Sequence, residues 1–166
     1  MNRVISADLQ PIDTSVCSEE LKNCHESDRF EYHQVDVRNR INFLINGDVH
    51  RIANFAAVHR EPGHAPHEYY ETNIPGADNV CSWAETVGCE RIIFTSSIST
   101  YGPTEESKDE ESIPTPATAY GGSKLAAEKI HEIWQAKDAK NRQLVIVRPG
   151  VVFGPGERGG ECKSAY

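Results

Sequence analysis

Short runs of β-branched and other apolar residues alternate along this chain with longer stretches that suit helices. The strand candidates are Arg3–Ala7, Glu31–Val37, Arg51–Ala57, Arg91–Ser97 and Leu144–Arg148. The helix candidates are Arg38–Ile45, Pro66–Val87 with a bend at Pro75-Gly76, and Tyr120–Ala139. Strands that alternate with helices form βα units, in which each helix returns the chain to the same end of the sheet. The sequence therefore predicts an α/β fold with a parallel sheet and flanking helices.

A serine-rich turn and a tyrosine–lysine pair are the candidate catalytic residues. The turn, Thr95–Gly102, follows the apolar run Arg91–Phe94, and the pair is Tyr120 and Lys124. If Tyr120 opens a helix, Lys124 lies one turn later on the same face. The ammonium then lowers the tyrosine pKa from about 10 toward neutral pH, so that the phenolate can take a proton from a hydroxyl group. Ser97, at the strand end, is placed to hydrogen-bond the same substrate oxygen.

These motifs resemble the extended short-chain dehydrogenase/reductase family, and within it the nucleotide-sugar epimerase and dehydratase branch. The resemblance runs from Val4 to about Gly160. Its supporting segments follow the family's order and are Val4–Asp8, Val35–Val37, Asn54–Val58, Tyr70–Asn73 and Val147–Gly156. The resemblance implies a Rossmann-type fold that binds NAD and a nucleotide-diphosphate sugar. Residues 1–150 would be a partial NAD-binding domain, and residues 151–166 would start a substrate-binding region.

The same resemblance assigns the contacts with the cofactor. Asp8, at a strand end, would accept both adenosine ribose hydroxyls and favour NAD over NADP, although aspartate is also a common turn residue. Asp36 and Val37 would contact the adenine, with a helix cap as the alternative for Asp36. For Asn73 the alternatives are a brace between the strands on the cofactor side and a helix cap. The remaining implied contacts are Phe55, Ala56, Ala57, Tyr120, Lys124 and Pro149.

Two residues of the serine turn narrow the chemistry. Related sugar 4,6-dehydratases place an Asp-Glu pair where this chain has Ile98 and Ser99, neither of which is an acid at neutral pH. The glutamate of the decarboxylases and the cysteine of the epimerase-reductases are also missing. The resemblance therefore implies oxidation and re-reduction at one carbon, which is epimerisation. Related galactose epimerases carry an asparagine where this chain has Val151, so the resemblance does not imply specificity for UDP-galactose. The alternatives are a one-way NAD(P)-dependent reductase of a sugar ketone and a non-catalytic fragment.

No glycine-rich turn precedes Asp8, where the resemblance requires one. In dinucleotide-binding folds a strand, this turn and a helix stand about 20 residues ahead of the ribose-binding acid. Here seven residues precede Asp8, and Gly47 is the first glycine. We therefore expect the central strand of the order 3-2-1-4-5-6 to be missing, with two unpaired strand edges as the result. We also expect truncation after Gly160, weak binding of NAD by the separate chain and no epimerase activity.

Composition and charge exclude several other classes of protein. A net charge of −8 disfavours a surface for nucleic acid or anionic membrane. No apolar run approaches the roughly 20 residues of a membrane span, so we expect a cytoplasmic protein. Five cysteines without a Cys-x-x-Cys pair indicate reduced thiols: Cys17, Cys24, Cys81, Cys89 and Cys162.

The histidines His59, His64 and His67 fit no common zinc motif, and Pro62, Gly63 and Pro66 interrupt any helix that would align them. We therefore expect no metal site, and a polar loop in its place. At the position of His59 the family sometimes has a lysine, so the resemblance does not imply a contact between His59 and the cofactor. A homodimer formed through the two longer helices is a further implication of the resemblance.

Overall fold

The computed structural model describes residues 3–13, 19, 22–23, 29–59 and 62–152 of the chain. The chain divides into two compact units, Met1–Gln34 with Gly150–Tyr166, and Val35–Pro149. The predicted substrate-binding region at 151–166 lies outside the described residues from residue 153 onward, and so do Cys17, Cys24 and Cys162.

The first unit contains a two-stranded parallel sheet. Strand β1 (Val4–Asp8) pairs with β2 (Phe30–Gln34), with Val4 opposite Phe30 and Asp8 opposite Gln34. The Tyr32 hydroxyl donates to the Asp8 carbonyl at 3.0 Å. Both strands were predicted, although β2 begins one residue earlier and ends three residues earlier than the predicted segment.

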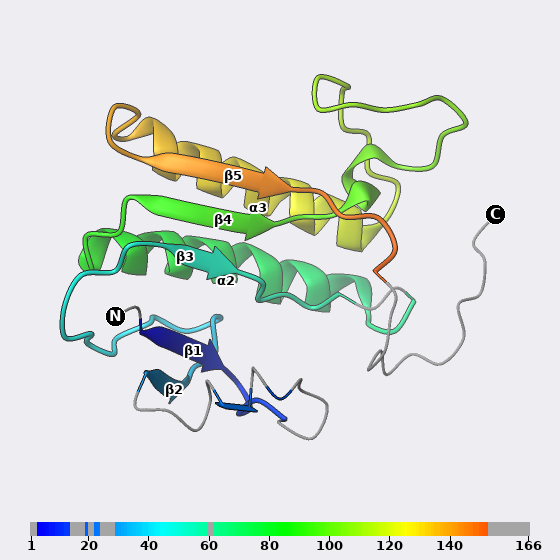
Figure 1. Ribbon diagram of the computed structural model, residues 1–166. Coiled ribbons are helices and arrows are strands. Elements are labelled where there is room, and N and C mark those ends of the chain that lie inside the picture. Colours follow the sequence, from blue (N-terminus) through cyan, green and yellow to red (C-terminus); the bar gives the residue numbers. More distant parts are fainter. Residues whose placement is uncertain (1–2, 14–18, 20–21, 24–28, 60–61, 153–166) are drawn as a thin grey trace. The chain divides into compact units, whose positions relative to one another are not determined.

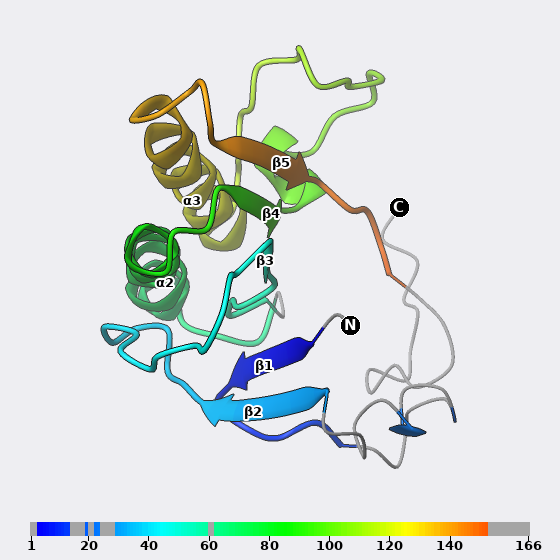
Figure 2. The same cartoon turned by 60° about the vertical axis from the view of Figure 1, so that its left-hand side comes forward.

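The second unit contains a three-stranded parallel sheet in the order β3-β4-β5 (Figure 1). The strands are β3 (Ile52–Asn54), β4 (Arg91–Thr95) and β5 (Gln143–Val147). Helices α2 (Pro66–Thr86) and α3 (Ala119–Ala136) lie side by side on one face of this sheet, as Figures 1 and 2 show. The predicted α/β class is confirmed.

The core of the second unit lies between the two helices and this sheet face. Burial alternates along β4, where Ile92 and Phe94 are buried, because successive strand residues point to opposite faces. Alanines of both helices face these side chains and keep the layers close, while Trp134 fills the far end of the core. The buried helix residues of these clusters are Ala77, Cys81, Ala84, Ala127 and Trp134. Cys81 and Cys89 are both buried free thiols.

The described strands are divided between two sheets. Within the part of the chain that the structure describes, β1–β2 and β3–β4–β5 are separate sheets. One edge of β1 and one edge of β3 therefore have no partner strand. Unpaired edges of parallel strands leave backbone donors and acceptors open to another chain segment.

The predicted helix at Arg38–Ile45 is wrong. The Asp36 carboxylate accepts hydrogen bonds from the Arg38 backbone at 3.0 Å and from its guanidinium at 2.6 Å, which closes a turn. Ile41, Phe43 and Ile45 then pack against α2 in an extended segment. The Trp83 indole donates to the Phe43 carbonyl at 3.3 Å and holds the segment there. Every second residue of this segment packs against α2, which is the pattern of an extended chain.

Helix α2 begins and continues as its sequence predicts. Pro66 occupies the first turn, where its missing N–H costs nothing, and Glu68 accepts a 2.6 Å hydrogen bond from the Ala65 backbone. The helix passes through Pro75, and Gly76 gives room for the Val37 side chain. Over the described ranges, no helix is both long and apolar enough to cross a membrane.

Candidate active site

The serine turn is a short 3₁₀ helix, η2 (Ile98–Tyr101), directly beyond β4. The Ser97 side chain caps it by accepting a hydrogen bond from the Ser99 N–H at 3.1 Å. The Ile98 N–H donates to the carbonyl of Pro149 at 3.0 Å, which ties the turn to the end of β5. Ser97 is therefore nearly buried and held by local backbone bonds at the carboxyl end of the sheet.

Helix α3 begins at Ala119, so Tyr120 and Lys124 lie one turn apart near its N-terminus, as predicted. Thr118 caps the helix, because its hydroxyl accepts a hydrogen bond from the Gly121 N–H at 3.1 Å. The ring of Tyr120 lies 5.8 Å from the ring of Tyr69 of α2, measured between centroids.

Two glycines follow Tyr120 because η2 and α2 approach this helix closely. A β-carbon at Gly121 would collide with the Ser99 carbonyl oxygen. A β-carbon at Gly122 would lie 2.7 Å from the Tyr70 hydroxyl. Glycine weakens a helix interior by about 1 kcal/mol relative to alanine. The close packing of the serine turn against the start of α3 thus accounts for residues that helix propensity disfavours.

Lys124 is buried, with 2% of its surface exposed. Its ammonium lies over the Phe94 ring, 4.4 Å from the centroid. It donates no hydrogen bond to any residue in the described ranges. Burial lowers the pKa of Lys124 to about 8, and the carboxylate of Glu128 opposes that shift. The side chain is therefore a buried cation with unused donors, and it is protonated at neutral pH.

Asn73 lies inside α2, so the helix-cap alternative is wrong, and its side chain bridges two other elements. It accepts from the Val58 N–H at 2.8 Å and donates to the Val58 carbonyl at 3.1 Å, just beyond β3. It also donates to the Ser123 hydroxyl at 2.9 Å, and Ser123 donates to the Tyr120 carbonyl at 2.8 Å. Asn73 thus braces the loop after β3 against the start of α3, and its expected role beside the cofactor stays a prediction.

The sequence patterns missed a buried polar row along α3, which consists of Ser123, Glu128 and His131. His131 donates from Nδ1 to the Ala127 carbonyl at 2.7 Å, and its Nε2 accepts from Asn54 at 3.3 Å. This bonding requires the neutral imidazole, and burial lowers the His131 pKa in the same direction. The spacing of Lys124, Glu128 and His131 on one helical face was the available signal.

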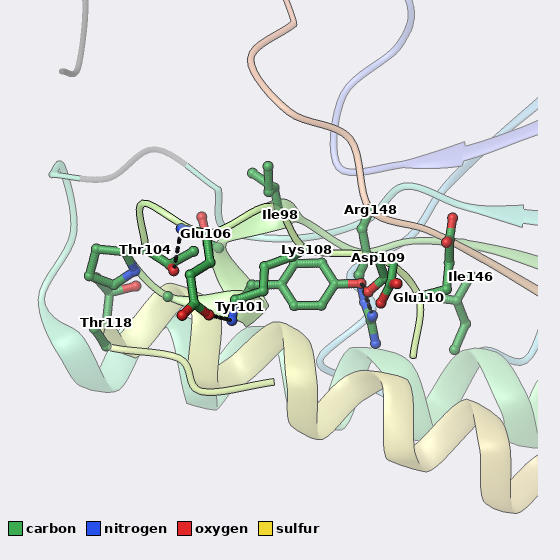
Figure 3. Close-up of a pocket in the computed structure, with 14 residues that line it drawn as sticks. Ile98, Tyr101, Thr104, Glu106, Lys108, Asp109, Glu110, Thr118, Ile146 and Arg148 are labelled. Atoms are coloured by element: carbon green, nitrogen blue, oxygen red, sulfur yellow. Dashed lines mark hydrogen bonds and ion pairs between the residues drawn. The ribbon is translucent and has the colours of Figure 1, made fainter. Parts of the chain in front are cut away.

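Next to the serine turn lies an open cavity of about 890 Å³ (Figure 3). Its walls include Tyr101 and Arg148, whose side chains meet, together with the carboxylates of Glu106, Asp109 and Glu110. Lys108 pairs with Glu106 at 3.3 Å. Three carboxylates and two cations, Lys108 and Arg148, line the cavity, and this excess of negative charge suits hydroxyl groups better than phosphate.

The predicted cofactor contacts fall on both units. In the first unit, Asp8 is exposed at the end of β1. Its carboxylate accepts a hydrogen bond from the Gln10 N–H at 3.2 Å, so Asp8 acts as a turn residue here. In the second, the side chain of Arg38 lowers the pKa of Asp36 by hydrogen bonding to its carboxylate. No helix begins within residues 37–59, so Asp36 caps none there. Adenosine contacts by Asp8, Asp36 and Val37 stay predictions.

Residues 55–57 follow β3 as a loop rather than ending the strand. Phe55 is 72% exposed, and Ala56 and Ala57 beside it are small. The Ala56 N–H donates to the Asn54 side chain at 3.2 Å, which fixes the loop. Residues 55–57 and Lys124 could contact the cofactor, as the resemblance implies. Asn73 already uses both amide N–H groups, on the Val58 carbonyl and on the Ser123 hydroxyl.

His64 lies in the loop that leads into α2, whereas His67 is in the first turn of that helix, and both are exposed. Among the residues that the structure describes, no three His, Cys, Asp or Glu side chains are grouped in a way that could hold a metal ion. His64 instead packs its ring edge-on against Tyr69, with 5.7 Å between centroids.

Comparison with known proteins places the chain in a family. The NAD dependent epimerase/dehydratase family matches residues 8–165. The chain is 39% identical over 104 residues to an N-acetyl-α-D-glucosaminyl-diphospho-ditrans,octacis-undecaprenol 4-epimerase of Escherichia coli O157:H7, covering 63% of this chain and 31% of that protein. It is 34% identical over 95 residues to UDP-glucose 4-epimerase 3 of Oryza sativa subsp. japonica, covering 57% and 25%.

The fold also resembles a solved structure. The UDP-glucuronic acid 4-epimerase of Bacillus cereus in complex with NAD superimposes with a TM-score of 0.72 at 21% identity, covering 94% of this chain and 51% of that one. The chain thus spans between a quarter and a third of the length of the two sequence relatives and about half of the solved structure.

Proposed function

The chain belongs to the NAD-dependent epimerase/dehydratase family, and we propose that it supplies the catalytic groups for NAD-dependent epimerisation of a nucleotide sugar. The observation that carries this proposal is the placement of Tyr120 and Lys124 one turn apart at the start of α3, which packs against the Ser97 turn. All three residues belong to the same compact unit.

Each of the three residues has a distinct role in this proposal. The Tyr120 phenolate removes the proton of the reacting hydroxyl and later returns it. Lys124 stabilises the phenolate, because an adjacent cation favours the charged form of the phenol. Its remaining donors bind ribose hydroxyls of the cofactor. Ser97 donates a hydrogen bond to the reacting oxygen, and the η2 backbone holds it in place. Bound NAD supplies the hydride acceptor and donor for the sugar carbon.

The reacting carbon and its carrier follow from the relatives under this proposal. The Escherichia coli, Oryza sativa and Bacillus cereus proteins are all named as 4-epimerases. We therefore assign inversion to the hydroxyl at carbon 4 of a diphosphate-linked hexose. A nucleotide carrier is favoured by the UDP-sugar relatives. The Escherichia coli relative, named for a polyprenyl carrier, makes a lipid-linked sugar the second candidate.

A hybrid protein tests the catalytic assignment. Residues Val35–Pro149 would replace the matching segment of the Escherichia coli relative, because they form one compact unit. We expect the hybrid to epimerise its substrate, and Tyr120→Phe to lower kcat by about 10²–10⁴-fold while NAD binding is kept. Tyr70→Phe, which removes a phenol on neighbouring α2, is the matched control and should keep most of the activity. A Tyr120→Phe hybrid with more than a tenth of the activity would contradict the assignment.

The same hybrid separates the rival functions. An epimerase leaves the cofactor as NAD after each turnover, whereas a one-way reductase consumes NADH in proportion to product. A single-turnover absorbance measurement at the nicotinamide band distinguishes these two. A hybrid that folds and binds NAD but turns nothing over would favour the non-catalytic alternative.

A further inference from the structure

Glu128 is a fully buried carboxylate that joins three elements of the second unit. Its residue has 0% of its surface exposed and lies one turn after Lys124 on α3. The Ser96 hydroxyl, at the end of β4, donates to it at 2.5 Å. Arg148, at the end of β5, donates from Nε at 2.9 Å and from Nη2 at 2.6 Å. A buried carboxylate requires such donors, because unpaired charge in the interior is costly.

These bonds reach both ends of the serine turn. Ser96 directly precedes Ser97, and Arg148 also donates from Nη1 to the Tyr101 hydroxyl at 2.5 Å (Figure 3). Tyr101 is the last residue of η2 and donates in turn to the Asp109 carbonyl at 2.7 Å. A single carboxylate on the helix of Tyr120 and Lys124 thus anchors the residues on either side of Ser97.

Glu128 also lies beside Lys124. Residues four apart share a helix face, and both side chains are buried, so little water screens their attraction. His131 of α3 is electrostatically coupled to Lys124, and β4 contributes the uncharged Phe94 ring. Tyr120 lies one turn before Lys124 and meets the Tyr69 ring of α2, while Arg148, directly after β5, pairs with Glu128. The neutral form of His131 adds no positive charge. Glu128 is the acidic residue of α3 that lies nearest to Lys124 in the sequence.

We propose that Glu128 is a positioning residue that fixes the Ser97 turn against α3 and keeps Lys124 as an ammonium ion. The role rests on the proposed function, since it serves the two groups that flank the Tyr120 phenol. Arg148 and Ser96 connect Glu128 to the turn through their hydrogen bonds. A plain structural ion pair would explain the Arg148 bonds, but it would not require the charge of Lys124 to depend on Glu128.

Two measurements on the 166-residue chain test this proposal. The first follows the titration of ¹³C-labelled lysine Cε, with the Lys124 signal assigned by its loss in Lys124→Met. The second follows hydrogen exchange of the η2 amides of Ile98, Thr100 and Gly102, all bonded to backbone carbonyls. We expect Glu128→Gln to move the Lys124 midpoint down by about one pH unit. We expect it to raise exchange at these amides by about tenfold.

Matched variants make the test specific. Glu132→Gln is the same substitution one turn later on α3, where the side chain is partly exposed and pairs with Lys129 at 2.8 Å. It should change neither readout. Ser96→Ala removes one bond to Glu128 but no charge, so exchange should rise while the Lys124 midpoint stays. This mild variant also decides the positioning role if Glu128→Gln does not fold.

An unchanged Lys124 midpoint in a folded Glu128→Gln variant would overturn the electrostatic part of the proposal, and unchanged exchange in Ser96→Ala would overturn the positioning part. Neither readout uses substrate or cofactor. An inactive hybrid would therefore count against the proposed function alone, and these two results would still decide the role of Glu128.

Discussion

Replacing Lys124 with methionine should stabilise this protein at neutral pH. Burial lowers the pKa of Lys124 from 10.5 to about 8. Each pKa unit corresponds to about 1.4 kcal/mol, so the charged side chain costs the folded state about 3 kcal/mol. The group is 2% exposed, so solvent screening reduces this cost little. Methionine keeps an unbranched stem of similar length over Phe94, and Glu128 keeps its bonds from Arg148.

The pH dependence gives this prediction its sign. Below about pH 8, Lys124 is protonated in the folded and unfolded states, and the full cost applies. Between about pH 8 and 10.5 the folded state has released the proton and the unfolded state has not, so the cost declines as the pH rises. Above that range Lys124 is neutral in both states. The advantage of methionine should thus be largest at pH 7 and nearly absent above pH 10.5.

Urea unfolding of the original chain and of Lys124→Met, at pH 7 and at several pH values up to about 10.5, measures the difference in unfolding free energy. Other titrating groups are common to both proteins and cancel in this difference. Lys129→Met is the control on the same helix, exposed and expected to change stability by less than about 0.5 kcal/mol. Destabilisation by Lys124→Met at pH 7, or a gain that does not vary with pH, would refute the reasoning.

Three other substitutions have defined outcomes. Gly121→Ala puts a β-carbon against the carbonyl oxygen of the serine turn and should lower the unfolding free energy by about 1–3 kcal/mol in urea, whereas Gly150→Ala meets no atom within 4 Å and should be neutral. Asn73→Ala leaves the partly buried Val58 N–H without its acceptor and should cost about 1–3 kcal/mol, with faster exchange of that amide as the readout. In a hybrid extended to include β1, Asp8→Ala should weaken NAD binding and narrow its preference over NADP, and tighter binding of NADP by the unsubstituted hybrid would contradict the role of Asp8.

The fold was largely predictable because its signals are local. Apolar runs with β-branched residues specify β1, β4 and β5, and Pro66 and Thr118 mark the starts of the two long helices. The segment 38–45 was not predictable as a helix or strand from its own residues, since its conformation depends on partners elsewhere. Asp36 closes the preceding turn onto Arg38, and the Phe43 carbonyl is held by Trp83, forty residues away.

The placement of Tyr120 and Lys124 one turn apart was predictable for the same reason, because an i, i+4 spacing on one helix is a local pattern. The contacts by which Asn73 and Glu128 hold neighbouring elements were harder to predict. Asn73 contacts Ser123 across fifty residues, and Glu128 meets Ser96 and Arg148, which directly follow two different strands. Such contacts appear only when the sheet order brings the strand ends together. For Glu128, the trace in the sequence was the spacing of Lys124, Glu128 and His131 on one face of α3.

The start of α3 departs from the usual preferences of a helix that packs on a sheet. It has two successive glycines, Gly121 and Gly122, in the first turns, followed by buried Lys124 and Glu128. Each departure weakens folding, and each is explained by a neighbour: the Ser99 carbonyl, the Tyr70 hydroxyl, the Phe94 ring and the Arg148 guanidinium. Local choices that conflict with stability tend to gather where a protein does its chemistry. The combination of close backbone packing with buried charge therefore locates the candidate active site at this helix start, independently of the Tyr-x-x-x-Lys pattern.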